Sequence, residues 1–97
     1  MTGQTGTLPF DKNLMYPQRQ RFTVNSTAYD FFYRWNPVGS FATGRIVRVK
    51  DNTQIWSSKL VPQWYAKIRD PKTYALLMAL WFNQVTETLA EVQVYWD

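Results

Sequence analysis

The stretch Tyr29-Asp30-Phe31-Phe32-Tyr33-Arg34-Trp35 decides the fold class of this chain. Aromatic residues occupy its alternate positions 29, 31, 33 and 35. Successive side chains of a β-strand point to opposite faces of a sheet, so this stretch predicts a strand with one aromatic face. The pattern leaves open whether that face fills the core or belongs to a binding surface.

Strand-like patterns continue on both sides of this stretch. Residues 21–24 alternate before the turn-like Asn25-Ser26-Thr27, and residues 45–50 and 53–56 flank Asp51-Asn52, a pair that tolerates the positive φ of a tight hairpin turn. Residues 89–96 form a further strand candidate. Together the patterns predict a mainly β fold, a small barrel or sandwich of about five to seven strands.

Residues 71–82 fit two secondary structures. Asp70 is a suitable N-cap, Pro71 suits the first helical position, and residues 73–80 contain strong helix formers, so local propensity favours a single helix. The adjacent strand candidate and the connection at residues 83–88 favour a terminal β-hairpin instead. Because periodicity does not settle short apolar runs, both structures stay open here, with a slight preference for the strand.

The N-terminal region lacks the periodicity of the remaining chain. Residues 1–18 include Pro9 and Pro17, which interrupt a continuous ladder, together with the apolar anchors Phe10, Met15 and Tyr16. We interpret residues 1–18 as an extended N-terminal arm that docks on a neighbouring chain, and residues 19–97 as a single β-rich domain.

The composition argues against catalysis. The 97 residues include no histidine and no cysteine, whereas 18% are aromatic. Nucleophilic catalysis and most transition-metal sites depend on the two missing residue types, so we expect no enzyme, no cofactor and no metal. The N-terminus lacks the charged flank and apolar run of a signal peptide, and no stretch of about 18 apolar residues suits a membrane span.

Basic and aromatic residues are interleaved in the middle of the chain. The chain has 11 Lys and Arg against 7 Asp and Glu, and all the basic residues lie between Lys12 and Lys72. Such a surface suits an acidic protein or a single-stranded nucleic acid, which stacks its bases on aromatic side chains. The candidate partner-binding residues are Phe10, Met15, Tyr16, Arg34, Trp35, Arg45, Arg48, Lys50, Trp56 and Trp96.

The order of these features resembles the small plug proteins of phage tail baseplates. The resemblance covers about three quarters of the chain and is carried by four segments: Gln20-Arg21-Phe22-Thr23-Val24, Tyr29-Asp30-Phe31-Phe32-Tyr33-Arg34-Trp35-Asn36, Arg45-Ile46-Val47-Arg48-Val49-Lys50-Asp51 and Leu60-Val61-Pro62. It is a pattern of strands and turns without a signature motif, and the run at residues 75–80 does not fit it cleanly.

The resemblance implies a non-enzymatic structural subunit of a bacteriophage virion. Such a subunit would belong to the tail or baseplate hub and would plug or stabilise the tail channel by protein-protein packing. Its partners would be other virion proteins (hub, tail tube or baseplate subunits), with several copies in one assembly, put together in the host cytoplasm. The alternative from the residues themselves is a β-barrel module that binds single-stranded nucleic acid.

Overall fold

The computed structural model describes residues 4–11, 13, 14 and 16–96. Within these residues the chain forms strands and no helix, and therefore contains no helix of the length and apolarity that a membrane crossing requires. The strands are β1 (Gln4–Thr7), β2 (Gln18–Val24), β3 (Thr27–Asn36), β4 (Phe41–Arg48), β5 (Thr53–Leu60), β6 (Trp64–Arg69), β7 (Leu76–Val85) and β8 (Ala90–Trp96).

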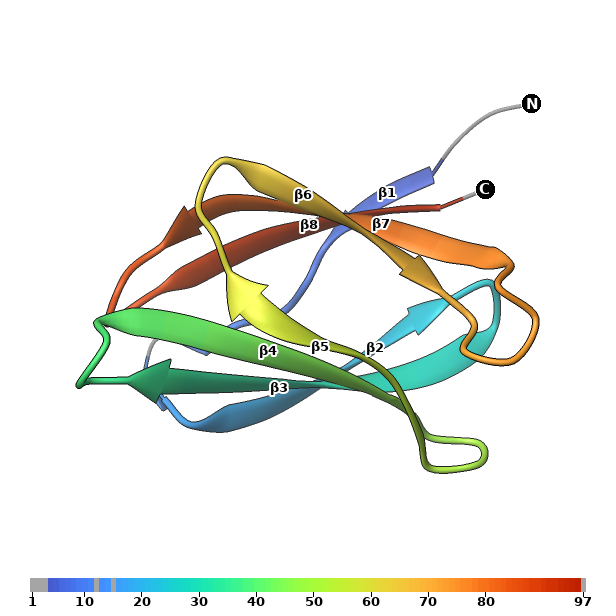
Figure 1. The fold of residues 1–97 in the computed structure, drawn as a ribbon, viewed down its shortest axis with the longest axis horizontal. Helices are drawn as coiled ribbons and strands as arrows, with labels where there is room; N and C mark the ends of the chain where they lie inside the picture. Colours follow the sequence, from blue (N-terminus) through green and yellow to red (C-terminus); the bar gives the residue numbers. More distant parts are fainter. Residues whose placement is uncertain (1–3, 12, 15, 97) are drawn as a thin grey trace.

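The strands form two antiparallel four-stranded sheets that pack face to face (Figure 1). We call the sheet of order β2-β3-β4-β5 the meander sheet, because consecutive strands pair, and the sheet of order β1-β8-β7-β6 the terminal sheet. No ladder joins the described strands of one sheet to those of the other. The mainly β prediction is confirmed as a sandwich and not as a closed barrel.

The core lies between the sheets and follows the alternation that the sequence displays. Tyr29, Phe31 and Tyr33 point inward from β3 and are buried, as are Leu80 and Phe82 from β7. The side chains of Phe31 and Tyr33 pack with ring centroids 4.5 Å apart. The aromatic face of residues 29–35 therefore fills the core for the most part and is not an exposed binding surface.

Gly44 on β4 makes room for this aromatic core. A Cβ at this position would lie 2.6 Å from Cζ of Phe31 and 2.8 Å from Cδ2 of Leu60. No real Cβ is accommodated at such distances, so the meander sheet requires glycine here for packing and not for an unusual φ.

The possible helix at residues 71–82 is not formed, and residues 76–85 are a strand, β7. β7 pairs with β6 on one side and β8 on the other, and Met78, Leu80 and Phe82 alternate into the core. Tertiary pairing thus overrides the helix propensity of this run. Asp70 caps only a turn, in which its Oδ1 accepts hydrogen bonds from the backbone N–H groups of Lys72 and Thr73.

The expected extended arm, residues 1–18, is not confirmed. β1 lies in this segment and pairs with β8, and Leu8 is 2% exposed in the core. Two prolines interrupt the segment as expected, but Leu8, Phe10 and Tyr16 pack against their own chain. The addition of β1 also explains why eight strands are present where about five to seven were predicted.

The two hairpin turns follow their turn residues. Asn25 and Ser26 have φ values of 50° and 64°, as a two-residue primed turn between β2 and β3 requires. Asn52 has φ of 57° in the longer loop, residues 49–52, that joins β4 to β5. Both predicted hairpins form, but the second has a four-residue loop in place of the expected two-residue turn. The first turn fixes which residues of β2 and β3 face outward, whereas the facing of β5 also depends on the register shift between Ile46 and Val47.

Candidate functional site

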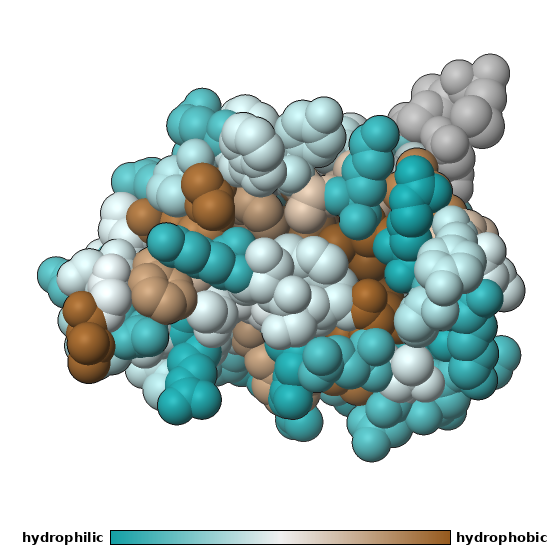
Figure 2. Space-filling model, in the orientation of Figure 1, coloured by the Kyte–Doolittle hydropathy of each residue, from teal (hydrophilic) through white to brown (hydrophobic). Residues whose placement is uncertain are grey.

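The outer face of the meander sheet collects basic and aromatic side chains. Because Phe31 and Tyr33 point inward, Phe32 and Arg34 point outward, and the ladders extend this parity to the neighbouring strands. Figure 2 shows hydrophilic side chains along the lower border of the molecule, the outer side of this sheet. We define the cationic face as Arg19, Arg21, Phe32, Arg34, Phe41, Thr43, Arg45, Ser57 and Lys59.

Strand register brings the cations of this face together. Phe32 lies opposite Arg19 on one side and Arg45 on the other. Two residues further along the strands, on the same face, Thr43 lies between Arg34 and Lys59. Residues from four strands, distant in sequence, thereby form two adjacent rows of positive charge.

The two phenylalanine rings of the face are covered by cations. The guanidinium carbon of Arg45 lies 4.3 Å from the ring centroid of Phe32, and Nζ of Lys59 lies 4.6 Å from that of Phe41. Each cation-π contact contributes about 0.5–1 kcal/mol at an exposed site. These contacts hold the two cations over the sheet while leaving their N–H groups available to an anion.

Negative charge is scarce on the face. Asp30 accepts hydrogen bonds from Nε and Nη2 of Arg21, at 2.9 and 3.4 Å, and this hydrogen bond is the main cause of a raised pKa of Arg21. Among the described residues, no ion pair involves Arg19, Arg34, Arg45 or Lys59. The face therefore carries positive charge without a counter-ion among the described residues.

A depression of about 420 Å³ lies within the face. Its polar lining residues include Arg34, Arg45, Thr43 and Ser57. Phe32 and Pro17 add apolar surface. Thr43 lies opposite Arg34 in the β3–β4 ladder, and Ser57 lies opposite Arg45 in the β4–β5 ladder, so the four residues come from three neighbouring strands.

The candidate basic residues of the sequence lie in different places. Arg34 and Arg45 are exposed in the cationic face, and Lys50 is exposed in the loop between β4 and β5. The side chain of Arg48 is only 15% exposed and forms ion pairs with Asp51 and Asp70, at 3.0 Å each. Arg48 thus fastens the β4–β5 loop to the turn before β7.

Trp35 and Trp56 lie on the inner side of the meander sheet. Trp56 packs between Phe31 and Phe82, with ring centroids 6.0 and 6.1 Å away, so it bridges the two sheets. Trp35 packs on Tyr16 at 5.8 Å. Both side chains are half-buried against the core and do not join the cationic face.

The arm anchors that the structure describes pack on their own domain. Phe10 contacts the rings of Tyr16 and Tyr33 at 5.3 and 5.0 Å. The Tyr16 hydroxyl donates to the carbonyl oxygens of Thr86 and Leu89, and burial raises the pKa of Tyr16 to about 12. Met15 lies outside the described residues.

Only Arg34 and Arg45 of the cationic face are among the site residues predicted from the sequence; the other members are Arg19, Arg21, Phe32, Phe41, Thr43, Ser57 and Lys59. The sequence does contain a signal for Phe32. It stands at an even position of the stretch 29–35, whereas the core aromatics stand at odd positions, so strand alternation turns Phe32 to the outer face. Arg19 follows from the hairpin turn at Asn25-Ser26, which pairs it with Phe32. Lys59 required the register shift between Ile46 and Val47, which no sequence pattern indicates.

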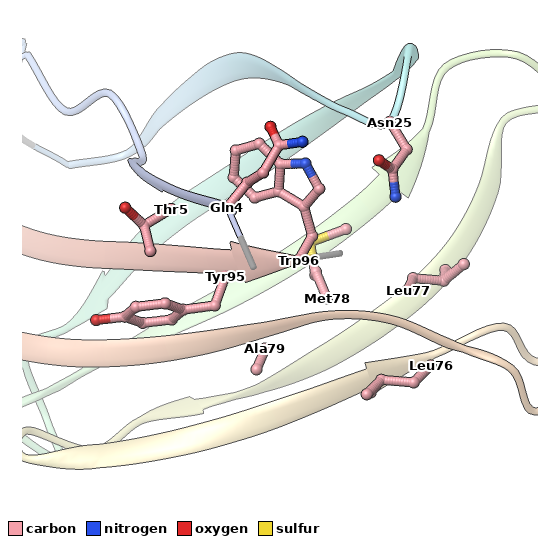
Figure 3. Close-up of a pocket in the computed structure, with 9 residues that line it drawn as sticks. All are labelled: Gln4, Thr5, Asn25, Leu76, Leu77, Met78, Ala79, Tyr95 and Trp96. Carbon is pink, nitrogen blue, oxygen red and sulfur yellow. The ribbon is translucent and has the colours of Figure 1, made fainter. Parts of the chain in front are cut away.

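A second depression, of about 360 Å³, lies at the end of the terminal sheet (Figure 3). It is lined by Leu76, Leu77 and Met78 at the start of β7, by Trp96 at the end of β8, and by Asn25 of the β2–β3 turn. This places the candidate Trp96 beside aliphatic side chains and not beside cations. The depression has no charged lining residue among those described.

Residue chemistry in the described part of the chain gives no sign of a metal centre, because no group of three or more acidic side chains comes together there. Comparison with family models, with curated proteins and with solved structures gives no match to this chain.

Proposed function

We propose that this chain is a non-enzymatic structural subunit of a phage virion, a tail or baseplate hub component that plugs or stabilises the tail channel by packing against other virion proteins. The observation that carries the proposal is the cationic face, a rigid sheet surface with four cations that have no counter-ion among the described residues. The resemblance to baseplate plug proteins supports the placement in a tail.

The cationic face suits a protein partner for two physical reasons. Its side chains stand on paired strands, so docking orders little backbone and the entropic cost of binding is low. Its unneutralised charge steers association toward an acidic surface and disfavours contact between two such faces. Hub, tail tube or baseplate subunits with an acidic patch are therefore the partners we propose.

A nucleic acid is the second candidate partner, because Phe32 and Phe41 lie among cations on a sheet, as in proteins that stack bases on aromatic rings. Stacking on either ring, however, requires removal of the cation that covers it. The geometry therefore favours the protein partner.

The proposal is tested in purified phage virions produced in a bacterial host that expresses this chain. Mass spectrometry of virions purified through a density gradient should detect the chain at a fixed ratio to the tail proteins. A tagged copy with Arg34→Glu and Arg45→Glu should be lost from the virions, whereas a tagged copy with Lys50→Glu, at an exposed loop position, should be retained. Absence of the unaltered chain from purified virions contradicts the proposal.

A further inference from the structure

We propose that the depression between Arg34 and Arg45 is an anion site that receives carboxylate side chains of an acidic segment in a partner protein. This inference rests on the proposed function, because it names the chemistry by which the cationic face recognises its partner. It adds a defined place on the face, four named polar side chains and a ligand class.

The arrangement of donors fits a carboxylate. Arg34 and Arg45 line the same depression and belong to successive same-face pairs of the β3–β4 ladder, Arg34 with Thr43 and Phe32 with Arg45. Guanidinium forks match the two oxygens of a carboxylate, and hydrogen bonds between charged groups are stronger than those between neutral groups. The hydroxyls of Thr43 and Ser57 add neutral donors at the same place. Both arginines lack a carboxylate partner among the described residues.

The same face already holds one carboxylate in this manner. Arg21 and Asp30 lie opposite each other across β2 and β3, and Nε and Nη2 of Arg21 both donate to Asp30. Arg34 and Arg45 stand on the same sheet face with no acidic residue in the equivalent position, since their opposite residues are Thr43, Phe32 and Ser57. A partner's acidic side chain would supply what Asp30 supplies to Arg21.

A nucleic-acid strand fits the depression less well. Arg45 and Lys59 lie over the two phenylalanine rings of the face, so no described ring of the cationic face lies open for a base. Strand-binding proteins combine a continuous basic groove with exposed stacking rings. The depression is bounded by Pro17 and Ser57 and offers charge at one place, which suits a short acidic segment.

The site is tested with the isolated chain, by NMR titration with a short peptide of consecutive glutamates. Saturable shifts should appear at the Nε–Hε signals of Arg34 and Arg45 and at the amides of Thr43 and Ser57, and a glutamine peptide of equal length should cause none. Arg34→Gln and Arg45→Gln should each weaken binding roughly tenfold. Lys67→Gln, which removes an exposed cation from the terminal sheet, should leave the affinity unchanged.

Three results would overturn the inference. One is no saturable shift at low salt, and another is equal weakening by Lys67→Gln and Arg45→Gln, which would show attraction to net charge alone. The third is tighter binding of a short oligothymidylate than of the glutamate peptide at near-physiological salt, which would assign the face to nucleic acid. If the chain is present in virions but does not bind the glutamate peptide, the proposed function is supported and the carboxylate site is contradicted. If the chain binds the peptide but is absent from virions, the carboxylate site is supported and the proposed function is contradicted.

Discussion

The outer faces of the two sheets differ in chemistry although they cover one core. On the cationic face of the meander sheet, Arg and Lys side chains without a counter-ion among the described residues lie in rows around Phe32 and Phe41. On the terminal sheet the row Tyr65, Trp81 and Gln93 points outward, next to the row Lys67, Ala79 and Tyr95. Strand alternation separates the residues that specify the fold from those that specify the surface, so each sheet carries its own outer chemistry.

The two faces also differ in how their polar groups are satisfied. On the terminal sheet the Tyr95 hydroxyl donates to the side chain of Gln93 at 2.8 Å, and the Asn83 amide donates to Glu91 at 3.0 Å. On the cationic face only Arg21 has such a partner among the described residues. A face that satisfies its own polar groups gains less from a partner, which supports the proposal that the meander sheet is the binding side.

The largest effect should come from a substitution that removes the support of both faces. Phe31→Ala leaves a cavity between the sheets and should lower the free energy of unfolding by about 3–5 kcal/mol. Phe32→Ala, one residue away on the cationic face, should cost far less because its ring is not part of the core. Urea denaturation of both variants checks this, and equal losses would show that the inner and outer sides of β3 are wrongly assigned.

A smaller effect is expected from the N-terminal segment, which supports the terminal sheet. Leu8 is buried and its backbone N–H donates to the carbonyl oxygen of Val92 on β8. Leu8→Ala should lower the free energy of unfolding by about 2–4 kcal/mol. Thermal unfolding provides the measurement, with Leu14→Ala as the control because Leu14 is exposed. An unchanged melting temperature for Leu8→Ala would restore the hypothesis of a free arm.

Equal charge changes on the two faces should have unequal consequences for binding. Arg45→Glu should weaken binding of the glutamate peptide by more than roughly tenfold, because it removes a donor and adds repulsion at the depression. Lys67→Glu changes the net charge by the same amount and should have a minor, salt-sensitive effect. Both variants should unfold within about 1 kcal/mol of the unaltered chain, since both side chains are exposed and only Arg45→Glu loses a cation-π contact.

The smallest expected effect is a change in how stability depends on pH, caused by the ion pairs of Arg48. The hydrogen bond from Arg48 is the main cause that holds the pKa of Asp51 at about 2, below its usual 3.8. Asp70 also has a pKa of about 2, mainly through the backbone N–H of Lys72 and then through Arg48. Because both pKa values are lowered in the folded chain, their stabilisation is complete above about pH 4 and is lost as the pH falls toward 2.

Arg48→Met should therefore flatten the dependence of stability on pH between about 4 and 2, but only in part, because Lys72 still donates to Asp70. Urea midpoints measured across this range check the change. If Arg48→Met still loses as much stability between about pH 4 and pH 2 as the unaltered chain, Arg48 does not set the pKa values of Asp51 and Asp70. Asp51→Asn should produce a smaller flattening, since it leaves the pair of Arg48 with Asp70.

The sequence predicted those parts of the fold that depend on local pattern. The alternation at residues 29–35 and the turn at Asn25-Ser26 act within a few residues, and both were read correctly. The strand β7 was ambiguous because its helix formers are overruled by β6 and β8, whose pairing is non-local. The docking of Leu8 was missed for the same reason, since its partner Val92 lies far along the chain.

The candidate site could be predicted in part. Arg34 and Arg45 were identified as basic residues next to aromatics, and both lie in the cationic face. Arg48 lies three residues after Arg45 on β4, so strand alternation turns it to the opposite face, where it pairs with Asp51 and Asp70. Trp56 faces the core because the register shift between Ile46 and Val47 places it opposite Ile46. Composition indicates a basic surface, whereas register decides which cations belong to it.

The pairing of β1 with β8 has a consequence for the synthesis of the chain. The meander sheet consists of consecutive hairpins from residue 18 to residue 60, so its ladders can form while later residues are still being translated. The terminal sheet cannot be completed until the end of the chain is made, because β1 is translated before the other strands and its partner β8 follows some ninety positions later. During that interval the inner aromatic side of the meander sheet lacks its cover, and early chain termination would release a species with an open, aggregation-prone core.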